Sequence, residues 1–254
     1  MKRIIAAIMV LVLAVTLSGC KEVPSFMPSY WDGLTKFGAK EYVQNALRDK
    51  YGEEFEVISM GIRSGQYYRE LVGTCSPKSE EDIFFRIEAN NFGGSRILHD
   101  GYVQSLVRQE MKSNIDSVLA KYCDKFAAEV DVRGLSDSYD SGICVAEDAT
   151  VKKYSESLPD SNETCIWIAL NDVRGDINDV VNMIVTDFYQ THAFIHFYYT
   201  NDDVINQCVE VINNDKSGDR LSIYNILYGH FPCDAFAYNG KENTLVQIEF
   251  ANKV

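Results

Sequence analysis

The chain has 254 residues, of which 46% are hydrophobic and 24% charged, proportions typical of a soluble globular protein. Its formal charge of −13 comes from 37 acidic and 24 basic residues, and a chain this acidic is repelled by nucleic acid and by anionic lipid headgroups. No cluster of Lys and Arg in the sequence offsets that repulsion, so we exclude nucleic acid as a partner.

The first expected element is an export signal at the N-terminus. Lys2 and Arg3 form a short basic start, and an almost entirely aliphatic run follows over residues 4–16. This run is too short to span a bilayer, which takes roughly 20 residues. It matches instead the apolar core of a signal peptide, which has about 7–15 residues.

The signal ends in Leu17-Ser18-Gly19-Cys20, which resembles the lipobox of bacterial lipoproteins. In that family the cysteine at this position is acylated, with chains such as palmitate, and becomes the mature N-terminus after cleavage. The resemblance covers this peptide alone. It implies a protein anchored through Cys20 to the extracytoplasmic face of the cell membrane. The alternative is an ordinary secretory signal whose cleavage site happens to include a cysteine.

Removal of the signal peptide, residues 1–19, leaves 235 residues, enough for one large or two small domains. The loss of its two basic residues takes the formal charge from −13 to −15. Residues 20–37 contain two prolines and a glycine and lack hydrophobic periodicity. We therefore expect them to form a tether that lifts the folded part off the membrane.

Six further cysteines follow Cys20, and none belongs to a CxxC pair, so zinc-ribbon and thioredoxin-like sites have no support. They are Cys75, Cys123, Cys144, Cys165, Cys208 and Cys233. Six cysteines allow fifteen pairings, and the sequence does not choose among them. An extracytoplasmic location permits disulfides, with Cys144–Cys165 the easiest local closure. Alternatively, Cys165 and Cys208 occupy core-like positions, where a cysteine packs as a small hydrophobe.

The first half of the predicted fold, residues 38–133, shows helical periodicity at both ends and strand-like alternation between them. Val43 and Leu47, four residues apart, belong to the apolar stripe of the first helix. In chain order we expect a helix over 39–50, strands near 54–57, 66–75 and 83–88, a loop over 90–95, and a long helix over 100–128.

Residues 134–164 shift in composition toward Ser, Asp, Glu and Gly, and apolar residues become sparse. This segment is the best boundary between two α+β halves. A long excursion within one domain also fits the same composition.

The second half, residues 165–254, is more regular and predicts the order β-α-β-α-β-β-β, giving an α+β fold overall. Strand–helix–strand–helix–strand order indicates crossover connections, and Asn239-Gly240 favours a hairpin with a two-residue turn. The expected elements are a strand over 166–170, a helix over 177–189, a strand over 193–198, a helix over 204–212, and strands over 221–228, 235–238 and 245–250.

The four histidines of the chain do not assemble a recognisable site. His192 and His196 fall on one face of a predicted strand, but about 13 Å apart at roughly 3.3 Å per residue, which is too far for one metal. His99 precedes the long helix beside Asp100, which suits a helix N-cap, and no nucleophile motif accompanies the pair. We therefore predict no catalytic residue, no metal ligand and no cofactor.

Each of three motifs has a structural explanation as well as a functional one. Arg174-Gly175-Asp176 is a tripeptide that adhesion receptors read, but its glycine allows a turn and its aspartate can cap a helix. Residues 213–219 resemble the start of a calcium loop, yet Tyr224 stands where the bidentate glutamate belongs. Residues 162–164 form a glycosylation sequon, which in a bacterial lipoprotein is simply an exposed loop.

Two classes of function stay open. One is a non-catalytic binding or interaction module for a protein, peptide or cell-wall partner, and the other is an extracytoplasmic hydrolase that uses Asp and Glu carboxylates. An enzyme should gather ionisable groups in a concave pocket, whereas a module should present an apolar or aromatic patch. Candidate stacking residues are Tyr67, Tyr68, Tyr139 and Tyr154, with core packing as their alternative role. We favour the binding module, because the histidines are scattered along the sequence and no catalytic motif accompanies them.

Overall fold

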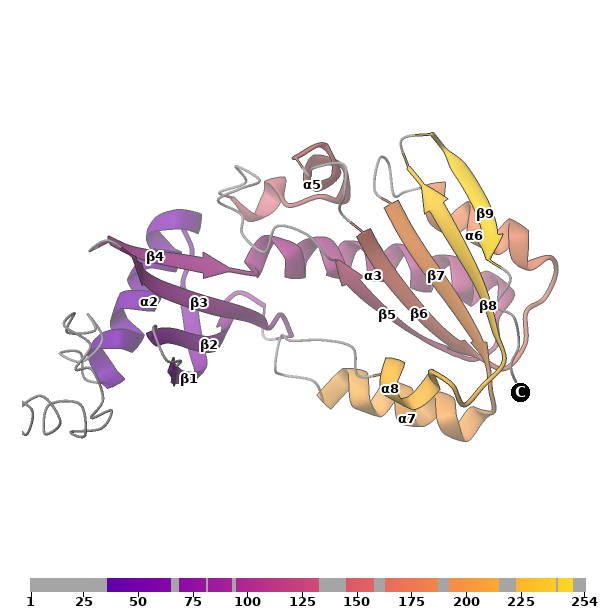
Figure 1. Cartoon of the computed structure of the whole chain (residues 1–254), viewed down its shortest axis with the longest axis horizontal. Helices are drawn as coiled ribbons and strands as arrows, with labels where there is room; N and C mark the ends of the chain where they lie inside the picture. Colours follow the sequence, from indigo (N-terminus) through magenta and orange to yellow (C-terminus); the bar gives the residue numbers. More distant parts are fainter. Residues whose placement is uncertain are drawn as a thin grey trace, which may run out of the picture.

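The computed structural model describes residues 36–64, 69–80, 82–92, 95–132, 145–157, 163–186, 192–214, 223–240 and 242–248. Within these ranges the chain forms two β-sheets joined by a long helix, which confirms the predicted α+β class (Figure 1). The signal peptide, Cys20 and nearly all of the tether lie outside the described residues. In the part that is described, no helix is both long enough and apolar enough to cross a membrane.

The first sheet is an antiparallel meander with the strand order β1-β2-β3-β4. Helix α2 covers one face, and its Val43 and Leu47 are fully buried in the core, as their spacing predicted. The sheet has four strands where we predicted three, because β4 fills the stretch between the loop expected to end at residue 95 and the helix expected to begin at residue 100, a stretch for which we predicted no element. The elements are α2 (Lys36–Tyr51), β1 (Phe55–Ser64), β2 (Arg69–Pro77), β3 (Phe85–Phe92) and β4 (Ser95–Asp100).

A β-bulge interrupts the pairing of β1 with β2 between Val57 and Ser59. The bulge brings the backbone of Ser59 close to Gly73, so that a Cβ atom on Gly73 would lie 2.5 Å from the Ser59 carbonyl oxygen. Real Cβ atoms do not approach an oxygen that closely, so only glycine fits at position 73 without a shift of the strand.

Helix α3 (Tyr102–Tyr122) passes from the first sheet to the second. Helical periodicity predicted this element, and Val103, Val107, Met111 and Ile115, which recur every four residues, are all buried. The predicted end near residue 128 is wrong, because α3 stops at Tyr122 and residues 126–132 form a strand. The turn Cys123-Asp124-Lys125 contains neither glycine nor proline, and Phe126 continues the four-residue spacing, so the sequence carries no stop signal there.

The second sheet has the order β5-β6-β7-β8-β9. Strands β6 and β7 are parallel and connected through α6, and the other neighbours are antiparallel. The elements are β5 (Phe126–Val132), β6 (Glu163–Leu170), α6 (Ile177–Val185), β7 (His192–Tyr199), α7 (Asp202–Asn214), α8 (Tyr224–Leu227), β8 (Cys233–Asn239) and β9 (Thr244–Ile248).

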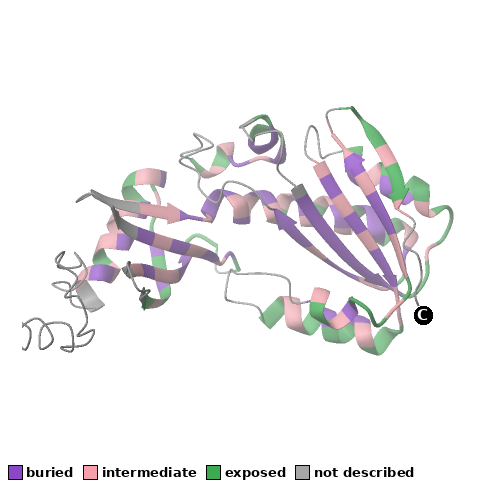
Figure 2. Cartoon of the chain, in the orientation of Figure 1, coloured by how far each residue is buried: buried purple, intermediate pink, exposed green. Residues whose placement is uncertain are grey.

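Helices lie on both faces of this second sheet, as Figure 1 shows. Alternate residues of β6 point to opposite sides: Ile166 and Ile168 join the core beneath α3 and α6, whereas Trp167 joins the core beneath α7 and α8. Every described side chain of β6 from Thr164 to Leu170 is buried, which explains the continuous apolar run that predicted this strand (Figure 2).

Two details of the second half correct the prediction. The strand expected over 221–228 is the short helix α8, because Ile223 and Leu227 both point into the core at the four-residue spacing of a helical turn. The β8–β9 hairpin pairs Asn239 with Thr244, so its loop has the four residues 240–243 rather than two. Asn243 in that loop takes a positive φ of 50°.

Of the segment 134–164, the described residues 145–157 pack on the folded body. It contains the 3-10 turn η1 (Ala146–Asp148) and helix α5 (Val151–Ser157), whose Val151 and Tyr154 are buried. The carboxylate of Glu110 in α3 accepts a 2.7 Å hydrogen bond from the Val151 backbone N–H. The domain division itself stays a prediction, although the second sheet already begins at Phe126.

The described cysteines are thiols and do not form disulfides. Cys165 is a free, buried thiol in β6, so it does not use the local closure with Cys144 that the sequence left open, and Cys144 itself lies outside the described residues. Cys165 and Cys208 both join the core between the sheet and α7, as their core-like positions indicated. The remaining thiols are Cys75, Cys123 and Cys233, of which Cys233 alone is only half-buried.

Candidate functional site

A partly exposed surface lies on the second sheet beside α7. Helix α7 packs over β5 and β6, whereas among the described residues the same face of β7, β8 and β9 is less covered. The strand register aligns Phe194, Ala237 and Val246 in one row across this face. Phe194 and Ala237 are half-buried, and Val246 is 59% exposed. We call the exposed parts of β7–β9 on this face the open surface.

Aromatic rings extend from the buried part of this face to solvent. Trp167 stacks on His196 with 6.3 Å between ring centroids and 7° between planes, and His196 stacks on Tyr198 at 6.3 Å and 21°. Trp167 also meets Tyr224 edge-on at 5.9 Å, and Tyr224 stacks on Tyr228 at 4.8 Å. Tyr228 is 61% exposed, so the array ends in an accessible ring. These five residues are called the aromatic array below.

Cys233 of β8 lies beside this array. Its Sγ is 3.9 Å from Nδ1 of His196 and 3.5 Å from the backbone oxygen of Asp234. Burial raises the pKa of the Cys233 thiol to about 11, although a hydrogen bond with the Tyr198 side chain acts in the opposite direction. Burial also lowers the pKa of His196. At neutral pH the pair is therefore a thiol beside an uncharged imidazole, and not the thiolate–imidazolium pair of a nucleophilic cysteine.

The neighbouring acid does not complete a catalytic constellation with this pair. Asp234 points to the opposite face of the sheet, where its carboxylate accepts a 2.7 Å hydrogen bond from the Tyr199 hydroxyl. Burial raises the pKa of Tyr199, and its hydrogen bond with Asp234 raises that pKa further. Because Asp234 and His196 are on different faces, Asp234 does not orient the imidazole.

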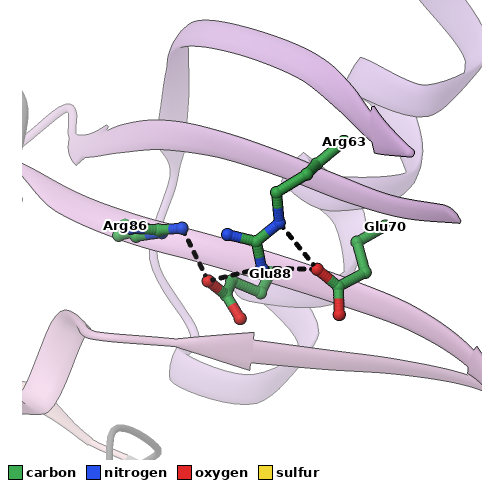
Figure 3. Close-up of polar contacts among 4 residues, drawn as sticks. All are labelled: Arg63, Glu70, Arg86 and Glu88. Atoms are coloured by element: carbon green, nitrogen blue, oxygen red, sulfur yellow. Dashed lines mark hydrogen bonds and ion pairs between the residues drawn. The ribbon is translucent and has the colours of Figure 1, made fainter. Parts of the chain in front are cut away.

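A second cluster of polar side chains lies on the first sheet, on the face opposite α2 (Figure 3). Arg63 of β1 reaches Glu70 of β2 at 2.5 Å and Glu88 of β3 at 3.7 Å, and Arg86 pairs with Glu88 at 2.8 Å. The two positive and two negative charges balance, and the pairs are exposed enough for each to contribute only about 0–1 kcal/mol. Both carboxylates are occupied by guanidinium groups, so this face does not present a separated pair of acids for hydrolysis.

The structure separates the histidines that the sequence singled out. His192 and His196 share one face of β7 with Phe194 between them, as predicted. His99 of β4 is opposite Glu88 on the first sheet, whereas the strands of the aromatic array belong to the second sheet. Among the described residues, no group of three or more His, Cys, Asp or Glu side chains could hold a metal ion.

The Arg174-Gly175-Asp176 tripeptide has the structural role that we gave as its alternative. Gly175 adopts a positive φ of 110°, and the Asp176 carboxylate caps α6 by accepting from the Asn178 backbone N–H at 2.9 Å. This hydrogen bond, together with a second one from the Asn178 side-chain amide, lowers the pKa of Asp176. Arg174 pairs with Asp124 at 3.4 Å.

Tyr154 is 2% exposed, so its role as an exposed stacking residue is wrong. The other three candidate tyrosines, Tyr67, Tyr68 and Tyr139, lie outside the described residues. Of residues 213–219 only Asn213 and Asn214 are described, at the end of α7. Of the sequon only residues 163 and 164 are described; they belong to β6, and Thr164 is fully buried, so the exposed loop that we expected there is wrong for these two residues.

Sequence reasoning did not find the contact between His196 and Cys233. The two residues are 37 positions apart and meet because β7 pairs with β8 in a register that sets Tyr198 opposite Cys233. The only sequence signal was the apolar alternation of β7, which placed His196 on a face without saying which strand would lie beside it.

No protein-family model matches the sequence, and no curated protein matches it either. Among solved structures, the chain is similar to the crystal structure of a DUF5037 family protein from Ruminococcus gnavus ATCC 29149. The two share 17% sequence identity with a TM-score of 0.56, over 82% of this chain and 94% of that one. At this identity the likeness shows the fold alone. The match covers 82% of the chain, which is more than either half of the chain contains, so the shared fold includes residues from both sheets.

Proposed function

We propose that the protein is a lipid-anchored extracytoplasmic lipoprotein whose folded part is a non-catalytic binding module. The lipobox ending in Cys20 supports the anchor, since two or more acyl chains hold a protein stably on a membrane. The proline-bearing segment 20–37 supplies the tether. Anchoring raises the effective concentration of the module for partners close to the membrane.

The open surface is the observation that carries the binding function. It presents Phe194, Ala237 and Val246 on a sheet face that the described helices leave partly exposed. The aromatic array supplies an accessible ring at Tyr228. Aromatic and apolar groups of this kind provide most of the binding energy at protein interfaces. The partner is therefore a protein or peptide segment with apolar side chains.

Charge restricts the class of partner. The mature chain carries a formal charge of −15, which repels anionic polymers and favours neutral or basic partners. The hydrolase alternative has weaker support, because Glu70 and Glu88 are each paired with an arginine and the Cys233 thiol stays protonated at neutral pH.

Site-specific photo-crosslinking in a bacterium that carries the protein tests this proposal. A benzophenone side chain placed at Val246 or at Tyr228 should capture the same identified protein, because both positions border the proposed interface. The matched control is Asn182, which is exposed on α6 at the opposite side of the sheet. Val246→Glu should weaken capture from Tyr228 at least tenfold by burying an unpaired charge. Equal capture from Asn182 would contradict the assignment of the open surface.

The catalytic alternative is tested in parallel with peptidoglycan, peptide and ester substrates. Turnover that disappears when one Asp, Glu or His is replaced by an isostere, in a variant that still folds, would favour the hydrolase. Capture of one partner without turnover supports the module.

A further inference from the structure

A thiol and an imidazole meet at the edge of the aromatic array, and neither is used by the proposed binding function. The Sγ of Cys233 in β8 lies 3.9 Å from Nδ1 of His196 in β7, and both side chains are half-buried. We propose that Cys233 and His196 bind Cu(I), a soft monovalent cation that thiolate and imidazole ligands prefer. This inference does not rest on the proposed function.

The separation of the two atoms suits a bridging metal. With a metal–sulfur bond of about 2.3 Å and a metal–nitrogen bond of about 2.0 Å, a 3.9 Å separation corresponds to an angle of about 130° at the metal. That angle lies between trigonal and linear coordination. No movement of the two strands is required for both atoms to reach one ion.

The number of ligands selects Cu(I) over zinc. Structural zinc takes four protein ligands, and no cluster of even three His, Cys, Asp or Glu occurs among the described residues. Cu(I) is stable with two or three ligands. The site therefore provides two protein ligands and leaves one position for a third donor from solvent or from a delivering molecule.

The residues around the pair support a bound cation. Tyr198 hydrogen-bonds the Cys233 sulfur, and such outer contacts orient a ligand and stabilise its charged form. Trp167 stacks parallel to the His196 ring, at 7° between planes, and thereby fixes the plane in which Nδ1 points.

Binding must displace the thiol proton, because burial raises the pKa of Cys233 to about 11. The reaction is the exchange of one proton for one Cu⁺ ion at sulfur, with no change of oxidation state.

The test is an anaerobic titration of the full chain with Cu(I) in competition with bicinchoninate. Trp31→Phe leaves Trp167 as the reporter, because the chain has two tryptophans. We expect one equivalent to bind with quenching of Trp167 fluorescence. Cys233→Ser and His196→Gln should each weaken that binding at least 100-fold. Tyr198→Phe, which removes a hydrogen bond to the sulfur, should weaken it about 10–100-fold.

The matched control is Cys208→Ala, which removes a fully buried thiol of α7 and should leave the affinity unchanged. Circular dichroism of each variant shows whether it is folded, and both Cys233→Ser and Cys233→Ala are measured so that one misfolded protein does not decide the result. Unchanged Cu(I) affinity in folded Cys233 or His196 variants overturns the proposal. So does the absence of Cu(I) binding in the parent chain, which would leave the contact as a thiol–imidazole hydrogen bond.

Discussion

The hydroxyl of Tyr51 donates a hydrogen bond of 2.5 Å to the carboxylate of Asp100, a side chain with no exposure to solvent. Lys50 Nζ binds the second carboxylate oxygen at 2.8 Å, and the Tyr102 backbone N–H bonds the first at 3.2 Å. One buried acid thus fixes the last turn of α2 to the junction of β4 and α3. The fold of the first half depends on this contact, because α2 has no other charged anchor on the sheet with comparable burial among those described.

Replacing Asp100 with alanine should therefore be strongly destabilising. The change removes the acid that pairs with the Lys50 ammonium, whose side chain is only 17% exposed, and it removes the acceptor of the Tyr51 hydroxyl hydrogen bond. We expect a loss of about 3–5 kcal/mol in the free energy of unfolding, measured by urea denaturation. Tyr51→Phe, which removes one hydrogen bond to a charged group, should cost about 1.5–3 kcal/mol.

The control for this prediction is Lys78→Ala, which breaks an exposed ion pair with Glu54 at 3.7 Å. An exposed pair contributes about 0–1 kcal/mol, so this variant should unfold almost as the parent does. If Asp100→Ala and Lys78→Ala had the same denaturation midpoint, the buried acid would not hold α2 in place.

This contact also marks the limit of what the sequence could predict. Local periodicity predicted α6, α7 and the buried stripe of α3, because each spacing repeats within one element. Asp100 was expected as the N-cap of helix α3, but Gly101 takes that position, although the Asp100 carboxylate accepts a hydrogen bond from the Tyr102 backbone N–H. The contact of Asp100 with Tyr51 spans 49 positions. The contact of His196 with Cys233 depends on strand register in the same way. Pairing between distant strands leaves no periodic signal in one sequence.

The strand β5 was missed for a related reason. Ala127 and Val130 of β5 are buried on opposite faces of the sheet, since β5 packs against α3 on one side and α7 on the other. A strand covered on both faces loses the alternation that identifies it. Its first residue, Phe126, continued the helical spacing of α3, so the helix prediction extended into it.

Gly73→Ala should destabilise the first sheet. A methyl group at this position would meet the Ser59 carbonyl oxygen at 2.5 Å, and both atoms belong to paired backbone that cannot rotate away. We expect a loss of about 1–3 kcal/mol, the usual cost of overpacking. Gly61→Ala is the matched control, because Gly61 lies in the same strand pair and an added Cβ meets nothing within 4 Å. Equal thermal midpoints for the two variants would show that the bulge relaxes freely.

Stability should fall at alkaline pH through the buried thiols. Burial raises the pKa of Cys75 to about 12 and those of Cys123 and Cys208 to about 11, whereas an unfolded thiol has a pKa of about 8.5. The folded state binds the proton more tightly, so this contribution is complete below about pH 8.5 and is lost as pH rises toward 11. Urea midpoints measured from pH 7 to 11 should decline.

Cys75→Ala tests the origin of that decline. The variant lacks the thiol with the highest pKa, so its midpoint should fall less steeply with pH than that of the parent, whatever its midpoint at pH 7. If the urea midpoints of parent and variant fall equally with pH, other groups cause the loss of stability at alkaline pH.

Ile184→Ala should cost about 2–5 kcal/mol in unfolding free energy, as large-to-small changes in a core do. Ile184 is 2% exposed in the middle of the buried stripe of α6, where it packs with residues of both the sheet and α3. Asn182→Ala on the exposed side of the same helix should change stability by no more than about 0.5 kcal/mol. A shift of only a few tenths of a kcal/mol for Ile184→Ala would mean that α6 is peripheral to the core.

Cys20→Ala should release the protein from the membrane. The expectation comes from Leu17-Ser18-Gly19-Cys20, because an alanine has no sulfur to carry the diacylglycerol that a lipobox cysteine receives. The measurement is fractionation after a high-salt wash, which removes proteins held by charge alone. Ser18→Ala keeps a small residue in the lipobox and should leave the protein in the membrane fraction. If the Cys20→Ala protein still sediments with washed membranes, the anchor is not the acylated cysteine.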